Sequence, residues 1–162
     1  MMTNAQRVKY FNDEKVIGID PGKKGGIAVY SITSKKLIEV VKMPETVADL
    51  YNFFKLYSKN SFAYFEKVGS MPGQSGMFTF GKGWGNIEMA LYALKIPNET
   101  VTPQKWQKIF QMGVKGNKTG TEWKNKLKDR AQKLYPKENL TLVTADAVLI
   151  MEYGRRIKTG EL

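Results

Sequence analysis

The alternation of apolar and polar residues predicts a hairpin of two strands near the start of the chain. Val16–Ile19 forms a short apolar run, and the apolar alternation resumes at Ile27 after a turn rich in Pro and Gly. Apolar runs of this length, bounded by Pro and Gly, are typical of buried strands joined by a tight turn. We therefore expect a first strand that ends at Asp20 and a second strand that reaches Ile32.

The rest of the chain continues as strands and helices in alternation. Runs of β-branched and aromatic residues predict strands, and apolar residues three or four positions apart predict helices. The predicted strands are Lys36–Met43, Ser61–Val68 and Glu99–Thr102, and the predicted helices are Glu45–Tyr57, Met77–Leu94 and three more that begin near Pro103, Thr119 and Thr144. This order predicts an α/β protein with five strands.

The length of the chain predicts one domain. A chain of 162 residues has the size of one domain with at most a small appendage. Residues 1–12 are polar and basic with little periodicity, so we expect a basic flexible arm there and a single domain over residues 13–162.

The charge of the chain predicts a polyanionic partner. Lys and Arg number 26 against 15 Asp and Glu, which leaves a formal charge of +11. A basic surface is typical of nucleic-acid binders and also suits anionic membranes. No apolar run approaches the roughly 18 residues that span a bilayer, so we expect a cytoplasmic protein with no membrane partner.

The chain contains no Cys and no His, which excludes several kinds of chemistry. There is no disulfide framework, no thiolate zinc site and no histidine to act as a general base. Hydrolytic chemistry would depend on carboxylates, lysines and hydroxyls, for which Mg²⁺ and Mn²⁺ are the natural metals.

Two carboxylates stand at the ends of predicted strands. Asp20 ends the first strand, before glycines that would let a phosphate or metal approach the backbone, and Glu66 lies near the end of the strand from Ser61. If these strands are parallel, as the helix between them predicts, both carboxylates lie at one edge of the sheet. The alternatives are that Asp20 caps its own turn and that Glu66 is a solvated residue beside Lys67.

A third carboxylate and a basic helix lie in the second half of the chain. Asp146 falls in the first turn of the last predicted helix, where the helix dipole favours an acidic residue whatever its function. The helix that begins near Thr119 has an apolar stripe and a basic remainder, and the glycine-rich loop before it carries two lysines. A solvated face explains many such helices, but the loop lysines favour phosphate contact.

The first hairpin resembles the phosphate-binding hairpin of actin-like ATPases and sugar kinases. Those proteins enclose a nucleotide between two large lobes, which one domain cannot form. A nucleotide-binding fragment of this type remains an alternative, but we expect no nucleotide cofactor.

Four segments in order resemble the RuvC family of Holliday-junction resolvases, in particular its phage-type members. They are GIDPGKKGGIAVY, FEKVGSMPGQSGMFTFGKGWG, VTPQKWQKIFQMGVKGNK and TADAVLIMEYGRR. The resemblance implies a ribonuclease H-like fold with a central mixed five-stranded sheet, and a homodimer that binds four-way DNA junctions. It also implies paired nicks that leave a 5′ phosphate and a 3′ hydroxyl, with two Mg²⁺ ions per site for which Mn²⁺ can substitute.

The resemblance also assigns roles to residues. It assigns the metal ions to three catalytic carboxylates, Asp20, Glu66 and Asp146. Lys118 resembles the basic residue at the scissile phosphate, and Lys108 resembles a residue at the junction arms. Lys115 and Lys124 are DNA-binding candidates through their proximity to Lys118, and Met71 stands in the loop where family members can carry an aromatic wedge.

The chain departs from the family where a fourth metal ligand is usual. Three or four residues before the last aspartate stand Val143 and Leu142, which cannot bind metal. Water, Thr144 or another acid would have to replace that ligand, and Glu152 is a poor substitute because six residues along a helix turn it away from Asp146. The alternative function is therefore a junction-binding protein that does not cut.

Overall fold

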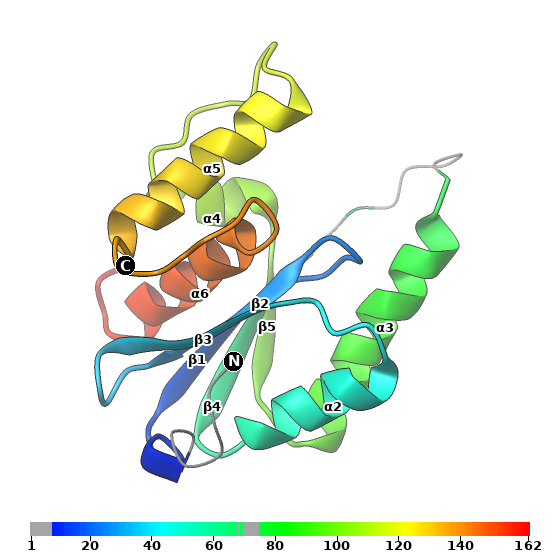
Figure 1. The fold of residues 1–162 in the computed structure, drawn as a ribbon, viewed down its shortest axis with the longest axis vertical. Helices are drawn as coiled ribbons and strands as arrows, with labels where there is room; N and C mark the ends of the chain where they lie inside the picture. The colour runs from blue at the N-terminus through cyan, green and yellow to red at the C-terminus, as the bar shows by residue number, and fades with distance from the viewer. Residues whose placement is uncertain (1–7, 68, 70–74) are drawn as a thin grey trace.

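Five strands form one mixed sheet in the order β3-β2-β1-β4-β5 (Figure 1). The computed structural model describes residues 8–67, 69 and 75–162. The strands are β1 (Lys15–Asp20), β2 (Gly26–Ser31), β3 (Lys36–Lys42), β4 (Ser61–Glu66) and β5 (Asn98–Val101). The helices are α2 (Val47–Leu56), α3 (Met77–Ala93), α4 (Pro103–Ile109), α5 (Gly120–Leu134) and α6 (Ala145–Lys158). This confirms the predicted α/β class and the five-stranded mixed sheet with flanking helices.

The central strand β1 has an antiparallel neighbour on one side and a parallel neighbour on the other. It pairs with β2 from Lys15↔Ser31 to Asp20↔Gly26, and with β4 from Lys15↔Ser61 to Ile19↔Phe65. The predicted parallel pairing of the first and fourth strands is therefore confirmed. Their carboxyl ends meet at the same edge of the sheet.

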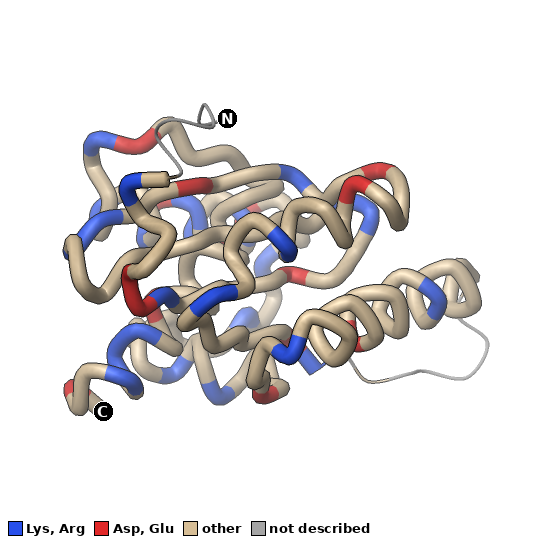
Figure 2. Tube along the Cα trace, turned by 90° about the horizontal axis from the view of Figure 1, so that it is seen from below, with Lys and Arg blue, Asp and Glu red and all other residues tan. Residues whose placement is uncertain are grey.

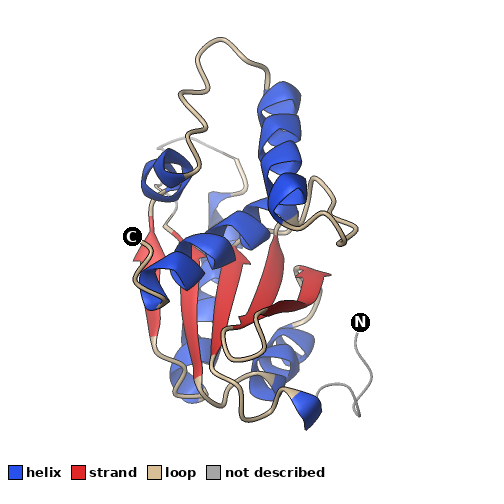
Figure 3. Cartoon of the chain, turned by 90° about the vertical axis from the view of Figure 1, so that its left-hand side faces the viewer, coloured by secondary structure: helices blue, strands red, loops and turns tan. Residues whose placement is uncertain are grey.

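Helices cover both faces of the sheet, as Figure 3 shows. One core cluster joins the sheet to α2 and α3 through residues such as Ile19, Phe54 and Leu91. The other joins it to α4, α5 and α6 through residues such as Trp106 and Leu149. Strand side chains alternate between these two layers, since successive residues of a strand point to opposite faces.

Local capping signals fix where most of the helices begin. Thr46 accepts a hydrogen bond from the backbone N–H of Asp49, so α2 begins later than its apolar pattern predicts. Thr119 and Glu122 form a capping box at the start of α5, which begins where the sequence predicts. Pro103 stands in the first turn of α4, where its missing N–H costs nothing.

Helix α6 crosses β1 at very short range because Gly18 has no side chain. A Cβ at position 18 would lie 2.2 Å from the backbone nitrogen of Met151 and 2.4 Å from the carbonyl oxygen of Ala147. Only glycine allows this approach of the helix backbone to the strand. The contact fixes the place of α6, and hence of its first turn, over the middle of the sheet.

Residues at the N-terminal end of the described chain are held against the sheet. The Nζ of Lys15 donates hydrogen bonds to the backbone carbonyls of Tyr10, Phe11 and Asp13 at 3.2, 3.3 and 2.6 Å. Asn60 Nδ2 donates to the carbonyl of Asn12 at 3.0 Å. The end of the predicted arm therefore has specific partners, while residues 1–7 lie outside the described residues.

Basic positions are spread over the whole fold. Figure 2 shows Lys and Arg on many segments of the trace rather than on a single element. Within the described residues, no helix is long and apolar enough to cross a membrane.

Candidate metal and nucleic-acid site

Two of the predicted carboxylates lie at the same edge of the sheet. Asp20 is the last residue of β1 and Glu66 the last residue of β4, and the residues before them, Ile19 and Phe65, are register partners. The parallel pairing therefore places Asp20 and Glu66 as neighbours, as the sequence predicts.

The turn after Asp20 is closed against the aspartate itself. A Cβ on Gly25 would lie 2.0 Å from the carbonyl oxygen of Asp20 and 3.2 Å from its carboxyl carbon. Glycine is therefore required there by the hairpin, whereas Gly22 has only Phe80 within 4 Å of such an atom. Gly26 is required as well, because a Cβ there would lie 2.7 Å from the carbonyl oxygen of Val41.

Asp146 joins the site from a helix, α6, and not from a strand. It lies in the first turn of α6, two residues after the N-cap Thr144, and is buried. The electrostatic influence of Asp146 reaches both Asp20 and Glu66, so the three carboxylates form one interacting group. The close contact of α6 with β1 at Gly18 is what carries Asp146 to the strand ends.

Glu66 is oriented by two tryptophans. Trp106 Nε1, from α4, donates a hydrogen bond to Glu66 Oε2 at 2.9 Å, and Trp84 Nε1, from α3, donates to the Glu66 carbonyl at 3.4 Å. Sequence reasoning assigned no role to either tryptophan. A buried Trp needs an acceptor for its N–H, and this need is the signal in the sequence that points to a polar partner.

Lys124 enters the carboxylate group directly. Its Nζ donates a hydrogen bond to Asp146 Oδ2 and forms an ion pair with it. The charge of Lys124 also acts on Asp20 and on Glu66. Sequence reasoning counted Lys124 as a DNA-binding candidate and did not anticipate this contact, because nothing in the sequence fixes which face of α5 meets α6.

Burial raises the pKa of every carboxyl group in the site, and repulsion by other carboxylates adds to the shift at Asp20 and Glu66. Burial, followed by the charge of Asp146, raises the pKa of Asp20 to about 7, although Lys124 opposes the shift. Burial likewise raises the pKa of Glu66 against the hydrogen bond from Trp106, and that of Asp146 against Lys124. Burial alone would lower the pKa of Lys124, but the three carboxylates raise it. The ionised form of the three carboxylates is therefore stabilised by a nearby positive charge.

The donor chemistry of the site fits a divalent metal ion. All three side chains offer carboxylate oxygens, the ligands that Mg²⁺ and Mn²⁺ prefer. Asp146 Oδ1 is buried and has no hydrogen-bond partner among the described residues. As they stand, however, no three acidic side chains in the described part of the chain are spaced as a ready metal-binding group. The three carboxylates are of the right chemical type for a metal ion, but one of them is paired with Lys124.

The two residues considered as substitutes for the missing fourth ligand have other contacts. Thr144 Oγ1 accepts a hydrogen bond from the backbone N–H of Thr141 at 3.1 Å, so its hydroxyl belongs to the turn before α6. Glu152 accepts hydrogen bonds from Arg155, Arg156 and Tyr135, which agrees with its being a poor substitute.

The other predicted DNA contacts lie at the periphery. Lys108 is exposed on α4, and Lys115 and Lys118 are exposed in the loop between α4 and α5. Hydrogen bonds from Thr119 lower the pKa of Glu122, and the charge of Lys118 adds to this effect, so Lys118 interacts with the start of α5. Met71, the predicted wedge, lies outside the described residues.

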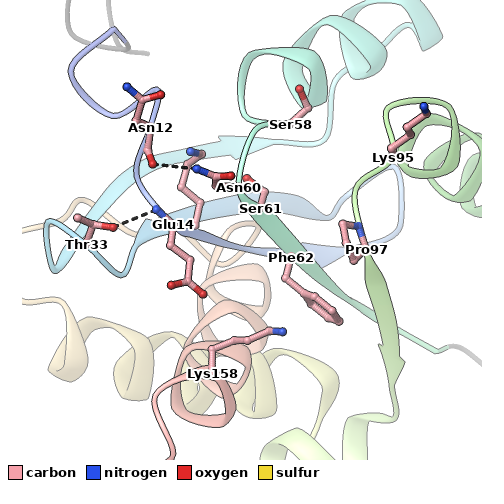
Figure 4. A pocket seen from close by; sticks show the side chains of 11 residues that line it. Asn12, Glu14, Thr33, Ser58, Asn60, Ser61, Phe62, Lys95, Pro97 and Lys158 are labelled. Atoms are coloured by element: carbon pink, nitrogen blue, oxygen red, sulfur yellow. Dashed lines mark hydrogen bonds between the residues drawn. The ribbon is translucent and has the colours of Figure 1, made fainter.

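A pocket of about 640 Å³ lies at the opposite edge of the sheet (Figure 4). It is lined by the first residues of β1 and β4, Lys15 and Ser61, and by Phe62, Pro97 and Lys158 among others. Asp20 and Glu66 are at the other ends of these strands. The pocket is therefore separate from the candidate site.

The fold is that of RuvC. The sequence matches no known protein-family model and no curated protein. In structure, the chain is similar to RuvC from Thermus thermophilus, with a TM-score of 0.64 and 18% identity over 90% of this chain and 96% of that one. RuvC of T. thermophilus in complex with a Holliday junction substrate gives a TM-score of 0.64 at 17% identity, with the same coverage. The predicted ribonuclease H-like, RuvC-like fold is thus confirmed.

Proposed function

We propose that the protein is a structure-specific DNA endonuclease that resolves Holliday junctions or other branched DNA. The observation that carries this proposal is the meeting of Asp20, Glu66 and Asp146 in one interacting group on a RuvC fold. One of the similar structures is RuvC bound to a Holliday junction. The formal charge of +11 suits such a substrate. A protein of this kind acts on DNA in the cytoplasm, and its phage-type motifs point to a mobile genome.

The three carboxylates would hold Mg²⁺, as two ions per site with Mn²⁺ as a substitute. When bound, such ions supply Lewis-acid polarisation of the scissile phosphate and a lower pKa for the attacking water. The residues of the chain hold the ligands in place: Trp106 fixes one oxygen of Glu66, and the turn at Gly25 fixes Asp20. Hydrolysis would leave a 5′ phosphate and a 3′ hydroxyl.

Lysines on one side of the strand ends are placed to receive the DNA backbone. The loop that carries Lys115 and Lys118 projects beyond the sheet at the start of α5, as Figures 1 and 3 show. Exposed ammonium groups are effective point-charge partners for phosphates. We assign Lys118 to the scissile phosphate, and Lys108 and Lys115 to the arms.

The outer face of α3 supports a homodimer. Phe78, Met89 and Tyr92 are 87, 65 and 79% exposed, and Gly81 and Gly85 lie between them at helical spacing with open space around their Cα atoms. Large and small residues in such a stripe suit close packing of two helices. Because Gly81 and Gly85 face open space, we infer that this face of α3 packs against a second copy of α3 and not against the sheet.

A second candidate function is junction binding without cleavage. It is favoured by Val143 and Leu142 at the position of the fourth ligand and by the lack of a ready three-carboxylate metal group in the described residues. Such a protein would keep the basic surface and the fold and would have lost its chemistry.

The test is a nicking assay on a synthetic four-way junction with Mg²⁺, with linear duplex as the control substrate. We expect wild-type protein to introduce paired nicks in the junction only. Asp20→Asn should reduce the rate at least about 100-fold, because it removes one charged oxygen ligand, and should leave junction binding in a gel-shift assay unchanged.

The two candidate functions give opposite results in this assay. If wild-type protein binds the junction but never cuts it with Mg²⁺ or Mn²⁺, the endonuclease proposal fails and the binding protein remains. If Asp20→Asn cuts as fast as wild type, the assignment of the site is wrong.

A further inference from the structure

Lys124 occupies the place in the carboxylate group where a cation is needed. Its Nζ pairs with Asp146 Oδ2, while Oδ1 of the same carboxylate is buried without a hydrogen-bond partner among the described residues. The pair joins two elements, α5 and α6, that pack against each other. One carboxylate therefore has one oxygen held by an ammonium and one oxygen left for another cation.

An ammonium group and a metal ion that bind the same carboxylate weaken each other's binding. A protonated lysine is a donor with no lone pair, so it can neutralise carboxylates but cannot serve as a ligand. Two positive charges at short range near a protein surface repel one another more strongly than they do in bulk water. A divalent ion bound by Asp146 would thus be opposed by Lys124 at its present position.

Lys124 is placed so that it can leave. Its side chain is 42% exposed, whereas that of Asp146 is 9% exposed. The aspartate is fixed by the first turn of α6, and the lysine stands on a flexible stem on the partly open face of α5. Of the two partners, the lysine is the one that can move without disturbing the core.

We propose that Lys124 is a displaceable counter-ion that stabilises the metal-free site, competes with the divalent ion for Asp146, and is released toward DNA phosphate when the ion binds. The competition concerns the chain and the metal alone. The final step, contact with phosphate, rests on the proposed function.

The test is Mn²⁺ binding without DNA, measured by electron paramagnetic resonance of the free ion and by calorimetry. We expect Lys124→Gln to bind Mn²⁺ at least about tenfold more tightly than wild type, because the competing charge is gone. Lys124→Arg keeps the charge and should bind no more tightly than wild type. Lys133→Gln, an exposed lysine on the same helix, should change the affinity less than twofold.

The stability of the metal-free protein gives a second measurement. In EDTA, the Tm of Lys124→Gln should lie below that of wild type, because three carboxylates then face one another without a cation. Addition of Mn²⁺ should raise the Tm of this variant more than that of wild type. This comparison also shows that the variant is folded.

Each outcome bears on the proposal separately from the endonuclease assignment. Equal or weaker Mn²⁺ binding by Lys124→Gln overturns the competition, and wild-type nicking with Mg²⁺ would then leave the endonuclease proposal intact. If neither protein binds Mn²⁺, both the competition and the metal-dependent function fail. Tighter binding by Lys124→Gln supports the competition even if no junction is cut.

Discussion

At the scale of single residues, the burial and mutual repulsion of charged carboxylates in the site oppose folding. The pKa of Asp20 is raised from 3.8 to about 7, first by burial and then by Asp146. A carboxyl group with a raised pKa in the folded state is more easily ionised in the unfolded state. Its contribution to stability is therefore present at low pH and is lost as the pH rises through the folded pKa.

This shift predicts how the metal-free protein responds to pH. In EDTA, the free energy of unfolding should fall between about pH 4 and pH 7, the interval between the unfolded and folded pKa of Asp20. Asp20→Asn carries no charge to bury, so its free energy of unfolding should fall by at least about 1 kcal/mol less over this interval. Urea unfolding at several pH values measures both curves.

A matched variant separates this effect from a general change of charge. Asp129→Asn alters an exposed aspartate on α5 and should keep the wild-type pH dependence. A pH dependence of Asp20→Asn as steep as that of wild type would show that Asp20 is not the buried titrating group.

At the scale of elements, the decisive contact is the crossing of α6 over β1. Gly18→Ala would place a methyl group 2.2 Å from a backbone nitrogen of α6, and backbone cannot rotate away as a side chain can. We expect the free energy of unfolding to fall by about 2 kcal/mol or more. Denaturant unfolding measures it, and nicking should fall as well because Asp146 moves with the helix.

Gly83→Ala is the control for this substitution. Gly83 lies within α3 with open space around it, so alanine there should leave stability unchanged or raise it by up to about 1 kcal/mol. If Gly18→Ala is as stable as Gly83→Ala, the crossing tolerates a side chain and does not fix α6.

The elements were largely predictable from sequence, and the contacts between them were not. Asp20 and Glu66 end two strands, and the rule for parallel strands was enough to bring them together. Lys124 and Trp106 lie on helices whose rotation against the sheet depends on packing that no local pattern encodes. Nothing in the local sequence distinguishes Gly18 from other glycines in strands, because the helix backbone that excludes a Cβ there comes from a distant part of the chain.

At the scale of the whole molecule, the exposed face of α3 predicts the oligomeric state. Wild-type protein should have a mass about twice 18.4 kDa by light scattering after size exclusion. Met89→Lys places a charge in the middle of the exposed stripe and should give the monomer mass, since a buried unpaired charge is costly.

A second lysine substitution controls for this result. Val114 is 84% exposed in the loop before α5, away from the stripe, so Val114→Lys should keep the wild-type mass. A wild-type protein that is monomeric at micromolar concentration would contradict the dimer.

The dependence of the site on α6 also has a consequence for timing during protein synthesis. The ribosome completes β1 and β4, with Asp20 and Glu66, well before it reaches Asp146. Until α6 has emerged and docked at Gly18, a nascent chain holds two of the three carboxylates and cannot form the complete group. Translation of α6 is thus the step that completes the candidate site, and a product truncated before it would lack the third carboxylate.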